Sequence, residues 1–321
     1  MNRFKLLALA ALISMALAVG ARSVLAEDAP AAGWTYSATA GGGFSFTSYQ
    51  DWQAGGTDSN ALTANLAGEA KYVNGKFSLA NTLKLAYGLT KVKDQDARKS
   101  DDRFDFSMLA SYQISGPLSG YVRGSLQTAM TASYLYYDPR VDAVFLDGRD
   151  TEYNVKKVKI ADGFQPLNLD EGIGLQFAAF IVAGVPEEGK DETPPDKHHL
   201  LFFAGAGARQ LVCDDYYKES DDAATPAKEF ALIDDYTDFG PEVSMDLRVT
   251  VSDTALLTSL AKGFYGADNE FWKATWETTL SLGITKAIGF SLTALMDYDE
   301  LVFEDPQWKT AGLLTLTYQL F

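Results

Sequence analysis

The chain has 321 residues, a formal net charge of −16 at pH 7 and a single cysteine. So acidic a chain is a poor candidate for binding nucleic acid or an anionic surface, because lysine and arginine supply the binding energy in such contacts. Because Cys213 stands alone, an internal disulfide framework is excluded.

The first predicted element is a secretory signal peptide over residues 1–26. Basic residues open it, an apolar run extends from Leu6 to Val19, and a small-residue cleavage site ends at Ala26. An uncleaved anchor is the alternative, but the run is short for a spanning helix of ~20 residues. Cleavage leaves 24 basic and 43 acidic residues, a net charge of −19. No later stretch is long and apolar enough for a spanning helix, so the mature chain is either soluble outside the cytoplasm or a membrane β-barrel.

Alternating apolar and polar residues predict a barrel domain over 43–321, after a short periplasmic lead at 27–42. The predicted strands are 43–52, 58–72, 76–88, 103–114, 120–136, 172–184, 199–212, 240–252, 256–265, 271–285, 289–300 and 308–321. The alternation is weakest in 199–212 and 256–265, where both faces are largely apolar or small.

Short and long connections alternate between these strands. Asn74-Gly75 is a strong signal for a two-residue hairpin, whereas 89–102, 137–171 and 213–239 are long and charged. The connection 185–198 departs from this alternation. Short turns at one rim and long loops at the other are typical of outer-membrane barrels. An even strand number would place both termini on the periplasmic side.

The predicted fold class is all-β, as one closed antiparallel transmembrane β-barrel of about 12 strands in the bacterial outer membrane. In lipid every backbone donor and acceptor must be paired, so strands can span only as a closed barrel. Closure gives each strand a lipid face and a lumen face, which explains the alternation. Aromatic residues also gather near both ends of the strands, as expected at two membrane interfaces. A soluble β-sandwich is the alternative, but its exposed face would be polar.

Several short motifs add a family resemblance. They are Trp52-Gln-Ala-Gly55-Gly56, Leu85-Ala-Tyr87-Gly88, Lys99-Ser-Asp101-Asp102, Trp272, Trp276-Glu277-Thr278 and Tyr298-Asp299-Glu300. On these motifs the chain resembles an uncharacterised group of bacterial outer-membrane barrels, domain-of-unknown-function family 3078. The resemblance implies a fold and a location, and no activity. The terminal Phe321 resembles the aromatic end that the barrel-insertion machinery recognises, which implies that machinery as a partner. Tyr318 departs from the usual pattern by one position.

The polar face of the predicted strands carries equal numbers of acids and bases, which we expect to form a lumen charge network. Its members are Glu69, Lys71, Lys84, Arg103, Asp105, Arg123, Glu242, Asp246, Arg248, Lys273, Glu277 and Asp297. A lumen of one sign would favour an ion-selective pore. A balanced lumen is equally consistent with a paired, hydrogen-bonded filling. About twelve strands lie between the number that side chains can fill and the number that leaves a water channel, so both interpretations stay open.

The loop 137–171 is unusually apolar for a solvated loop. We expect it to fold over or into the barrel mouth and to constrict it with Phe145, Leu146, Ile160 and Phe164. The alternative is a loop that packs on its neighbours outside the barrel.

The function predicted from these features is passive passage of a small solute through a constricted lumen. The alternative is a non-conducting structural or interaction barrel with a salt-bridged, plugged lumen. Its acidic surface loops would be bridged to lipopolysaccharide by divalent cations or bound by another protein. Catalysis is disfavoured because His198 and His199 are the only histidines, they are adjacent, and no serine motif accompanies them. We therefore expect no enzyme activity, no cofactor and no dedicated metal site. The expected partners are outer-membrane lipid and lipopolysaccharide, with no nucleic acid; the oligomeric state is left open.

Overall fold

The computed structural model describes residues 33–47, 59–92, 96–182, 198–220, 227–285, 288–300 and 306–319. The predicted signal peptide at 1–26, the Trp52-Gln-Ala-Gly55-Gly56 motif and the terminal Phe321 lie outside the described residues. Within the described ranges, no helix is long and apolar enough to cross a membrane.

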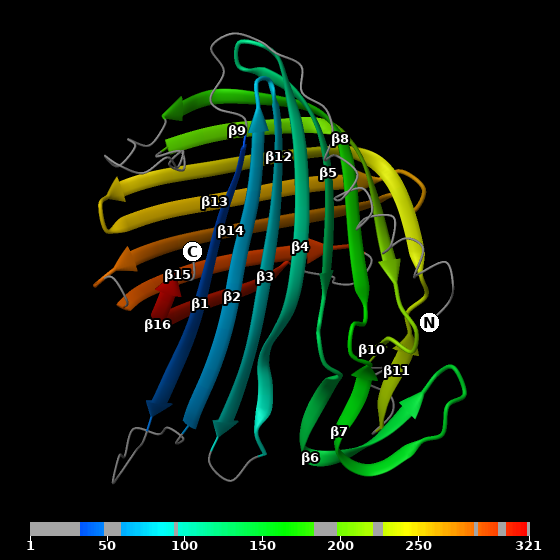
Figure 1. The fold of residues 1–321 in the computed structure, drawn as a ribbon. Coiled ribbons are helices and arrows are strands. Elements are labelled where there is room, and N and C mark those ends of the chain that lie inside the picture. The colour runs from blue at the N-terminus through cyan, green and yellow to red at the C-terminus, as the bar shows by residue number, and fades with distance from the viewer. Residues whose placement is uncertain are drawn as a thin grey trace.

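Most of the described chain forms one large antiparallel sheet (Figure 1). Its strands are β1 (Gly33–Thr47), β2 (Ser59–Asn74), β3 (Phe77–Val92), β4 (Arg98–Ser115), β5 (Leu118–Thr128), β8 (Leu167–Val182), β9 (His198–Val212), β12 (Tyr236–Ser252), β13 (Ala255–Gly266), β14 (Phe271–Gly283), β15 (Ile288–Asp299) and β16 (Gln307–Gln319). The predicted all-β, antiparallel fold is confirmed. Each predicted segment overlaps one of these strands.

The large sheet curls until its first and last strands meet. The strand order is β1-β16-β15-β14-β13-β12-β9-β8-β5-β4-β3-β2, and β1 pairs with both β2 and β16. The ladder between β1 and β16 is short, running from Thr39 opposite Gln319 to Gly42 opposite Leu316. Figure 1 shows β1 to β4 on one wall and β13 to β15 on the wall behind, with β5 and β8 at the bend between them.

A second, smaller sheet is built from two connections that we expected to be loops. Its strands are β6 (Ser133–Phe145), β7 (Glu152–Ala161), β10 (Tyr217–Glu219) and β11 (Lys228–Leu232), in the order β10-β11-β6-β7. β11 pairs with β6 in parallel, which places Phe230 opposite Phe145. We call this unit the loop sheet; in Figure 1 it lies beyond the ends of β5 and β8.

Several boundaries differ from the prediction, two of them by eight residues or more. β1 begins at Gly33, so 33–42, expected in the periplasmic lead, pairs with β2 instead. Its alternation of Trp34, Tyr36 and Ala38 with small polar residues was hidden by the glycines and alanines around it. The predicted segment 120–136 was also too long: β5 ends at Thr128, and the chain bends before β6 begins.

Candidate functional site: an interior network of charged side chains

The pairing register places the predicted lumen residues on one face of the large sheet. Lys84 stands opposite Asp105, for example, and Lys273 opposite Asp299, and the same alternation continues through each ladder of the sheet. The other face carries large apolar side chains with high exposure, including Ile173 at 61%, Val243 at 61% and Trp272 at 58%. The register therefore separates a charged face from an apolar one.

A contact between opposite walls shows that the charged face is the interior one. Arg103 on β4 and Glu277 on β14 are as far apart in the strand order as two strands can be. Even so, Arg103 Nη1 lies 3.9 Å from Glu277 Oε2, and Arg103 Nε lies 2.9 Å from Asp105 Oδ2. Side chains that meet in this way must both point into the space that the sheet encloses.

The most buried pair of the interior joins Arg123 on β5 to Glu242 on β12. Arg123 Nε donates to Glu242 Oε1 over 2.9 Å, Arg123 Nη2 contacts Oε2, and the Tyr121 hydroxyl donates to Oε1 over 2.6 Å. β8 and β9 lie between these two strands, so the backbones are ~14 Å apart along the sheet at ~4.8 Å per strand. The two side chains close that gap by reaching over the intervening strands.

Glycines on β8 and β9 make this reach possible. Arg123 pairs with Gly172 and Gly172 pairs with Gly207, so both glycines lie on the interior face beneath the Arg123–Glu242 pair. A Cβ atom at Gly172 would overlap the Glu242 carboxylate, and one at Gly207 would lie 2.6 Å from its Oε2. Any other residue at these positions would displace the carboxylate.

More ion pairs fill the half of the interior nearer the long loops. Arg209 Nη1 lies 3.0 Å from Asp170 Oδ1, and Lys273 Nζ lies 3.1 Å from Asp299 Oδ2. The Arg209 guanidinium also lies 4.8 Å from the centroid of the Phe264 ring, in a cation–π arrangement. We call the following set the interior network: the predicted lumen residues, Tyr121, Asp170, Arg209, Lys262 on β13 and Asp299.

The half nearer the short turns is more accessible to water. The Asp246 side chain is 41% exposed and that of Glu277 35% exposed, whereas that of Glu242 is only 4% exposed. Asp246 Oδ1 lies 3.4 Å from His199 Nε2, and the hydroxyls of Thr279 and Thr293 are 3.0 Å apart. The interior side chains are therefore more exposed toward the short turns and more closely paired toward the long loops.

Not every predicted lumen residue is joined to a partner. Some of them take part in the contacts above: Arg103, Asp105, Arg123, Glu242, Asp246, Lys273 and Glu277. The partner of Asp246 is His199. Within the described part of the chain, the following have no ion-pair partner: Glu69, Lys71, Lys84, Arg248 and Asp297. The pairing register thus places all twelve residues on one face of the sheet, and only some of them lie in ion pairs.

Sequence reasoning missed five members of the network. Arg209 and Lys262 lie on the two strands whose faces were hard to tell apart, and Asp170 lay inside a predicted loop. Tyr121 stood among aromatic residues near a strand end, where we expected a membrane interface, but it is 3% exposed and donates to Glu242. Asp299 was seen only as part of a motif. The glycines of β8 and β9 were the available signal, because an inward glycine leaves room for a neighbour's long side chain.

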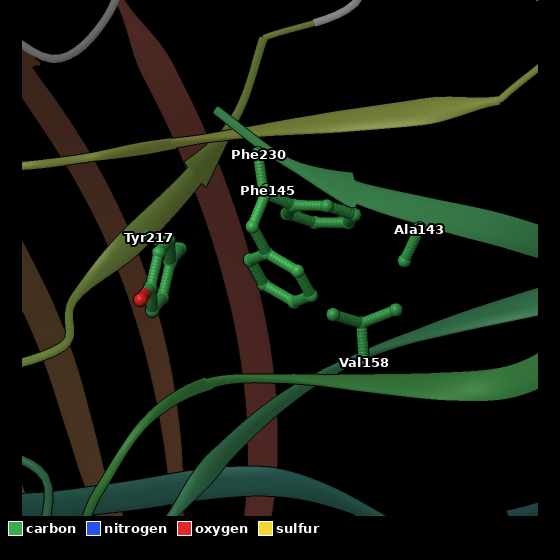
Figure 2. Close-up of a cluster of buried hydrophobic side chains, with 5 residues drawn as sticks. All are labelled: Ala143, Phe145, Val158, Tyr217 and Phe230. Carbon is green, nitrogen blue, oxygen red and sulfur yellow. The ribbon is translucent and has the colours of Figure 1, made fainter. Parts of the chain in front are cut away.

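The four residues expected to constrict the mouth do not form one group. Figure 2 shows Phe145 in the apolar core of the loop sheet with Ala143, Val158, Tyr217 and Phe230. Ile160 packs against that core, whereas Leu146 and Phe164 are 56% and 59% exposed. The reason is the parallel pairing of β11 with β6, which supplies the two loops with a core of their own.

Polar contacts at one edge complete the loop sheet. The Tyr217 hydroxyl donates to Asp147 Oδ2 over 2.8 Å, and the Arg149 guanidinium lies 4.1 Å from the centroid of the Phe145 ring. The backbone N–H of Arg149 and then the Tyr217 hydroxyl hold the pKa of Asp147 below its ordinary value. Burial is the main cause that raises the pKa of Tyr217, and its bond to Asp147 adds to this.

The Lys99-Ser-Asp101-Asp102 motif forms a second polar centre, which we call the rim node. The Asp102 carboxylate accepts from the backbone N–H groups of Met130 and Thr131 at 2.9 and 3.0 Å. Lys99 Nζ lies 2.6 Å from Asp102 and donates to the Ala132 carbonyl over 3.0 Å. The rim node therefore ties the end of β4 to the bend between β5 and β6, where the loop sheet begins.

The two histidines make structural contacts. His198 Nδ1 accepts from the backbone N–H of Thr250 over 3.2 Å, and His199 contacts Asp246. In the part of the chain that the structure describes, no three residues among His, Cys, Asp and Glu are grouped so that they could hold a metal ion.

The comparisons with known proteins concern family and fold. The family model "Protein of unknown function (DUF3078)" matches residues 44–134, so the resemblance is confirmed over that range. No curated protein matches. Among solved structures, the COG4313 outer membrane channel from Pseudomonas putida F1 is 10% identical with a TM-score of 0.38, covering 93% of this chain and 100% of that one. The translocator domain of the autotransporter NalP from Neisseria meningitidis is 12% identical with a TM-score of 0.33, covering 97% of each chain. At these values the similarity gives no information on activity.

Proposed function

We propose that this chain is an outer-membrane β-barrel, closed through β1 and β16, that passes small polar solutes passively. The constriction would be made by the barrel's own interior network and not by a loop. The main support for this proposal is the contact of Arg103 with Glu277. This contact would narrow the interior, whose side chains are more accessible to water in the half nearer the short turns.

The outer face supports a location in lipid. Exposed apolar side chains cover it, and a soluble sheet would lose solubility with a surface of this kind. Near the short turns, Trp34 stacks on Tyr36 at 5.9 Å and contacts Tyr72 at 5.2 Å. Near the long loops, Tyr265 and Trp272 lie 4.9 Å apart. Aromatic rings at both ends of spanning strands fit the two membrane interfaces.

The backbone supports closure. An unpaired edge in hydrocarbon costs several kcal/mol per unsatisfied group, so a sheet that spans a membrane must close. The ladder of β1 with β16 joins the two ends of the strand order. We further propose, as the terminal Phe321 implies, that the barrel-insertion machinery assembles the chain in the outer membrane, with lipopolysaccharide around its long loops.

The polarity of the interior supports passage. Ionised side chains from both walls lie where a solute would pass, and acidic and basic members are balanced. A balanced polar lining holds water and small polar molecules without strongly selecting one sign. The filled half near the long loops would set the size limit, and the water-accessible half near the short turns would serve as a vestibule.

The alternative function is a non-conducting barrel in which the same ion pairs are a permanent filling. The deep burial of Glu242 and Arg209 favours it, because a paired and hydrogen-bonded network can stabilise a filled interior. The two functions differ in one measurable property, the conductance of the native protein.

Conductance of the refolded protein in planar bilayers tests the proposal. We expect small single-channel currents from the native chain and larger ones from the double variant Arg103→Ala/Glu277→Ala, which removes the contact across the interior. The matched control is Arg149→Ala/Glu152→Ala, which removes an ion pair of 2.7 Å from the loop sheet and should leave the currents unchanged. A silent native protein with a conducting double variant would establish the alternative. Silence of both would reject passage altogether.

A further inference from the structure

One face of the loop sheet carries basic and aromatic side chains that the proposed function does not use. Leu135 on β6 packs against the apolar core of this sheet. Because neighbouring residues of a strand point to opposite faces, Tyr134 and Tyr136 lie on the face away from that core. The register of β6 with β7 places Lys159 opposite Tyr134 and Lys157 opposite Tyr136, so both lysines share this outer face.

The two tyrosine rings position two cations on this face. Lys157 Nζ lies 4.7 Å from the centroid of the Tyr134 ring. The guanidinium of Arg98, the first residue of β4, lies 4.9 Å from the centroid of the Tyr136 ring. A ring face attracts a cation in this arrangement without neutralising its charge. We call the following set the basic face: Arg98, Tyr134, Tyr136, Lys157 and Lys159.

Positive charge is in excess on the basic face. Lys159 Nζ lies 2.5 Å from Asp162 Oδ1, and its side chain is still 40% exposed. Arg98 and Lys157 have no ion-pair partner among the residues that the structure describes. The basic face thus sets three cations against one carboxylate, although the whole chain is acidic.

The basic face adjoins the rim node. Lys99 Nζ donates to the Ser133 hydroxyl over 3.3 Å, and Tyr134 is the next residue of β6. Arg98 precedes Lys99 on β4 in the same way. At this level the large sheet, which exposes apolar side chains, is followed by the loop sheet, which buries them. In the outer-membrane location that we propose, the basic face therefore lies at the height of the lipid headgroups, where tyrosine is also favoured.

Phosphate is the anion that this combination of side chains suits. Lysine and arginine bind phosphate oxygens through charge-assisted hydrogen bonds, and a tyrosine hydroxyl can donate one more. Lipopolysaccharide presents several phosphate groups at headgroup height, so that cations spread over two strands can each meet one. A single carboxylate or halide would engage only one of them.

We propose that the basic face binds the phosphate groups of lipopolysaccharide directly, without a bridging divalent cation. The inference rests on the outer-membrane location in the proposed function and goes beyond it, because it assigns a lipid contact to particular residues. It also differs from attachment through the acidic loops, which needs divalent cations. Lipid bound in this way would hold the loop sheet against the outer leaflet at one side of the barrel.

Binding of fluorescently labelled lipopolysaccharide to the full-length protein in detergent, followed by polarisation, tests the site. We expect binding to persist in EDTA and to weaken as salt is raised, because contacts between exposed charges are screened. Dephosphorylated lipopolysaccharide should bind far more weakly. Loss of binding in EDTA, or equal binding of the dephosphorylated lipid, would overturn the proposal. Displacement by an equal concentration of inorganic phosphate would also overturn it, since the site would then take free phosphate.

Variants assign the binding to the basic face. Arg98→Ala/Lys157→Ala should bind about thirtyfold more weakly, because each basic residue beside an anionic lipid surface contributes a factor of about five. Arg98→Lys/Lys157→Arg keeps both charges and should retain binding, which separates a lost site from a damaged fold. The control Lys156→Ala removes an exposed lysine whose side chain points to the opposite face of β7, and it should bind like the native chain. Native affinity in the double alanine variant would refute the site.

The binding measurement does not require conductance, so the inference and the proposed passage can fail separately. A native chain that conducts without binding lipopolysaccharide would refute the basic face as a lipid site and leave passage intact. A silent chain whose binding is lost in Arg98→Ala/Lys157→Ala would reject passage and support the lipid site.

Discussion

The large sheet and the loop sheet place polar and apolar side chains in opposite positions. The large sheet keeps Arg123 and Glu242 inside and exposes Ile173 and Val243 outside. In the loop sheet Phe145 and Phe230 are buried, whereas Lys156 and Lys157 on β7 are exposed. One chain thus builds a polar core and an apolar core a few residues apart along its length.

The reversal fits the surroundings that we propose for the two regions, water around the loop sheet and lipid around the large sheet. Water drives apolar groups inward, as in the loop sheet. Hydrocarbon has no such effect and instead requires that polar groups be enclosed, as in the large sheet. The change occurs at the bend after β5, where the rim node sits, so this bend marks the level at which we expect lipid to end.

The largest loss of folding stability should come from placing a Cβ atom beneath the Arg123–Glu242 pair. Gly172→Ala would force the Glu242 carboxylate away from Arg123, and separating a buried pair costs about 3–5 kcal/mol. Gly120→Ala on β5 is the matched control, since a Cβ there meets nothing closer than 3.9 Å. Urea unfolding in lipid vesicles, followed by tryptophan fluorescence, measures the difference. Equal stability of the two variants would mean that the glycines do not hold the carboxylate in place.

A slightly smaller and strictly local effect should follow from opening the apolar core. Phe230→Ala removes a fully buried ring, which costs about 3 kcal/mol or more. Because the buried cluster around this ring lies in the loop sheet, limited proteolysis should cleave the two loops faster while the large sheet keeps its unfolding midpoint. A lower midpoint for the large sheet would show that the two cores are energetically coupled.

The rim node tests the boundary between the two regions. Asp102→Ala leaves the backbone N–H groups of Met130 and Thr131 without their acceptor, and the cost should be at most about 1 kcal/mol because neither N–H is fully buried. We expect faster amide hydrogen exchange at 129–133 and faster cleavage of the loop sheet. Ser100→Ala, in the same motif, is the control. Unchanged exchange in Asp102→Ala would remove the structural role that we assign to the motif.

The smallest expected effect is a dependence of the stability of the loop sheet on pH. The pKa of Asp147 is lowered in the folded loop sheet from an ordinary value of 3.8, first by the Arg149 N–H and then by Tyr217. A depressed pKa stabilises the fold above the ordinary value, and that contribution is lost as the pH falls through the folded value. Cleavage of the loop sheet by an acid protease should therefore rise at the lowest pH. Asp147→Asn should make the rate independent of pH over that range, and a persistent acid dependence would point to another carboxylate.

The sequence predicted the large sheet well because period-two alternation is imposed locally, residue by residue. The charged face was recognisable in β4, β12 and β14, where each charge stands between apolar neighbours. The alternation could not reveal that Arg123 contacts Glu242. That contact depends on how the sheet curves and on Gly172 and Gly207, which lie far from both residues in the sequence. The core of the loop sheet was equally hidden, since Phe145 and Phe230 come from separate connections that pair in parallel.

The ladder between β1 and β16 has a mechanical consequence. It contains four residue pairs in the described chain, against fifteen between β1 and β2. This ladder has the fewest residue pairs in the described large sheet. In the closed barrel that we propose, it should therefore separate under heat or pulling force before any other pair of neighbouring strands. A pair of introduced cysteines at Thr39 and Gln319, which are paired across this ladder, would turn that weakest joint into a fixed one.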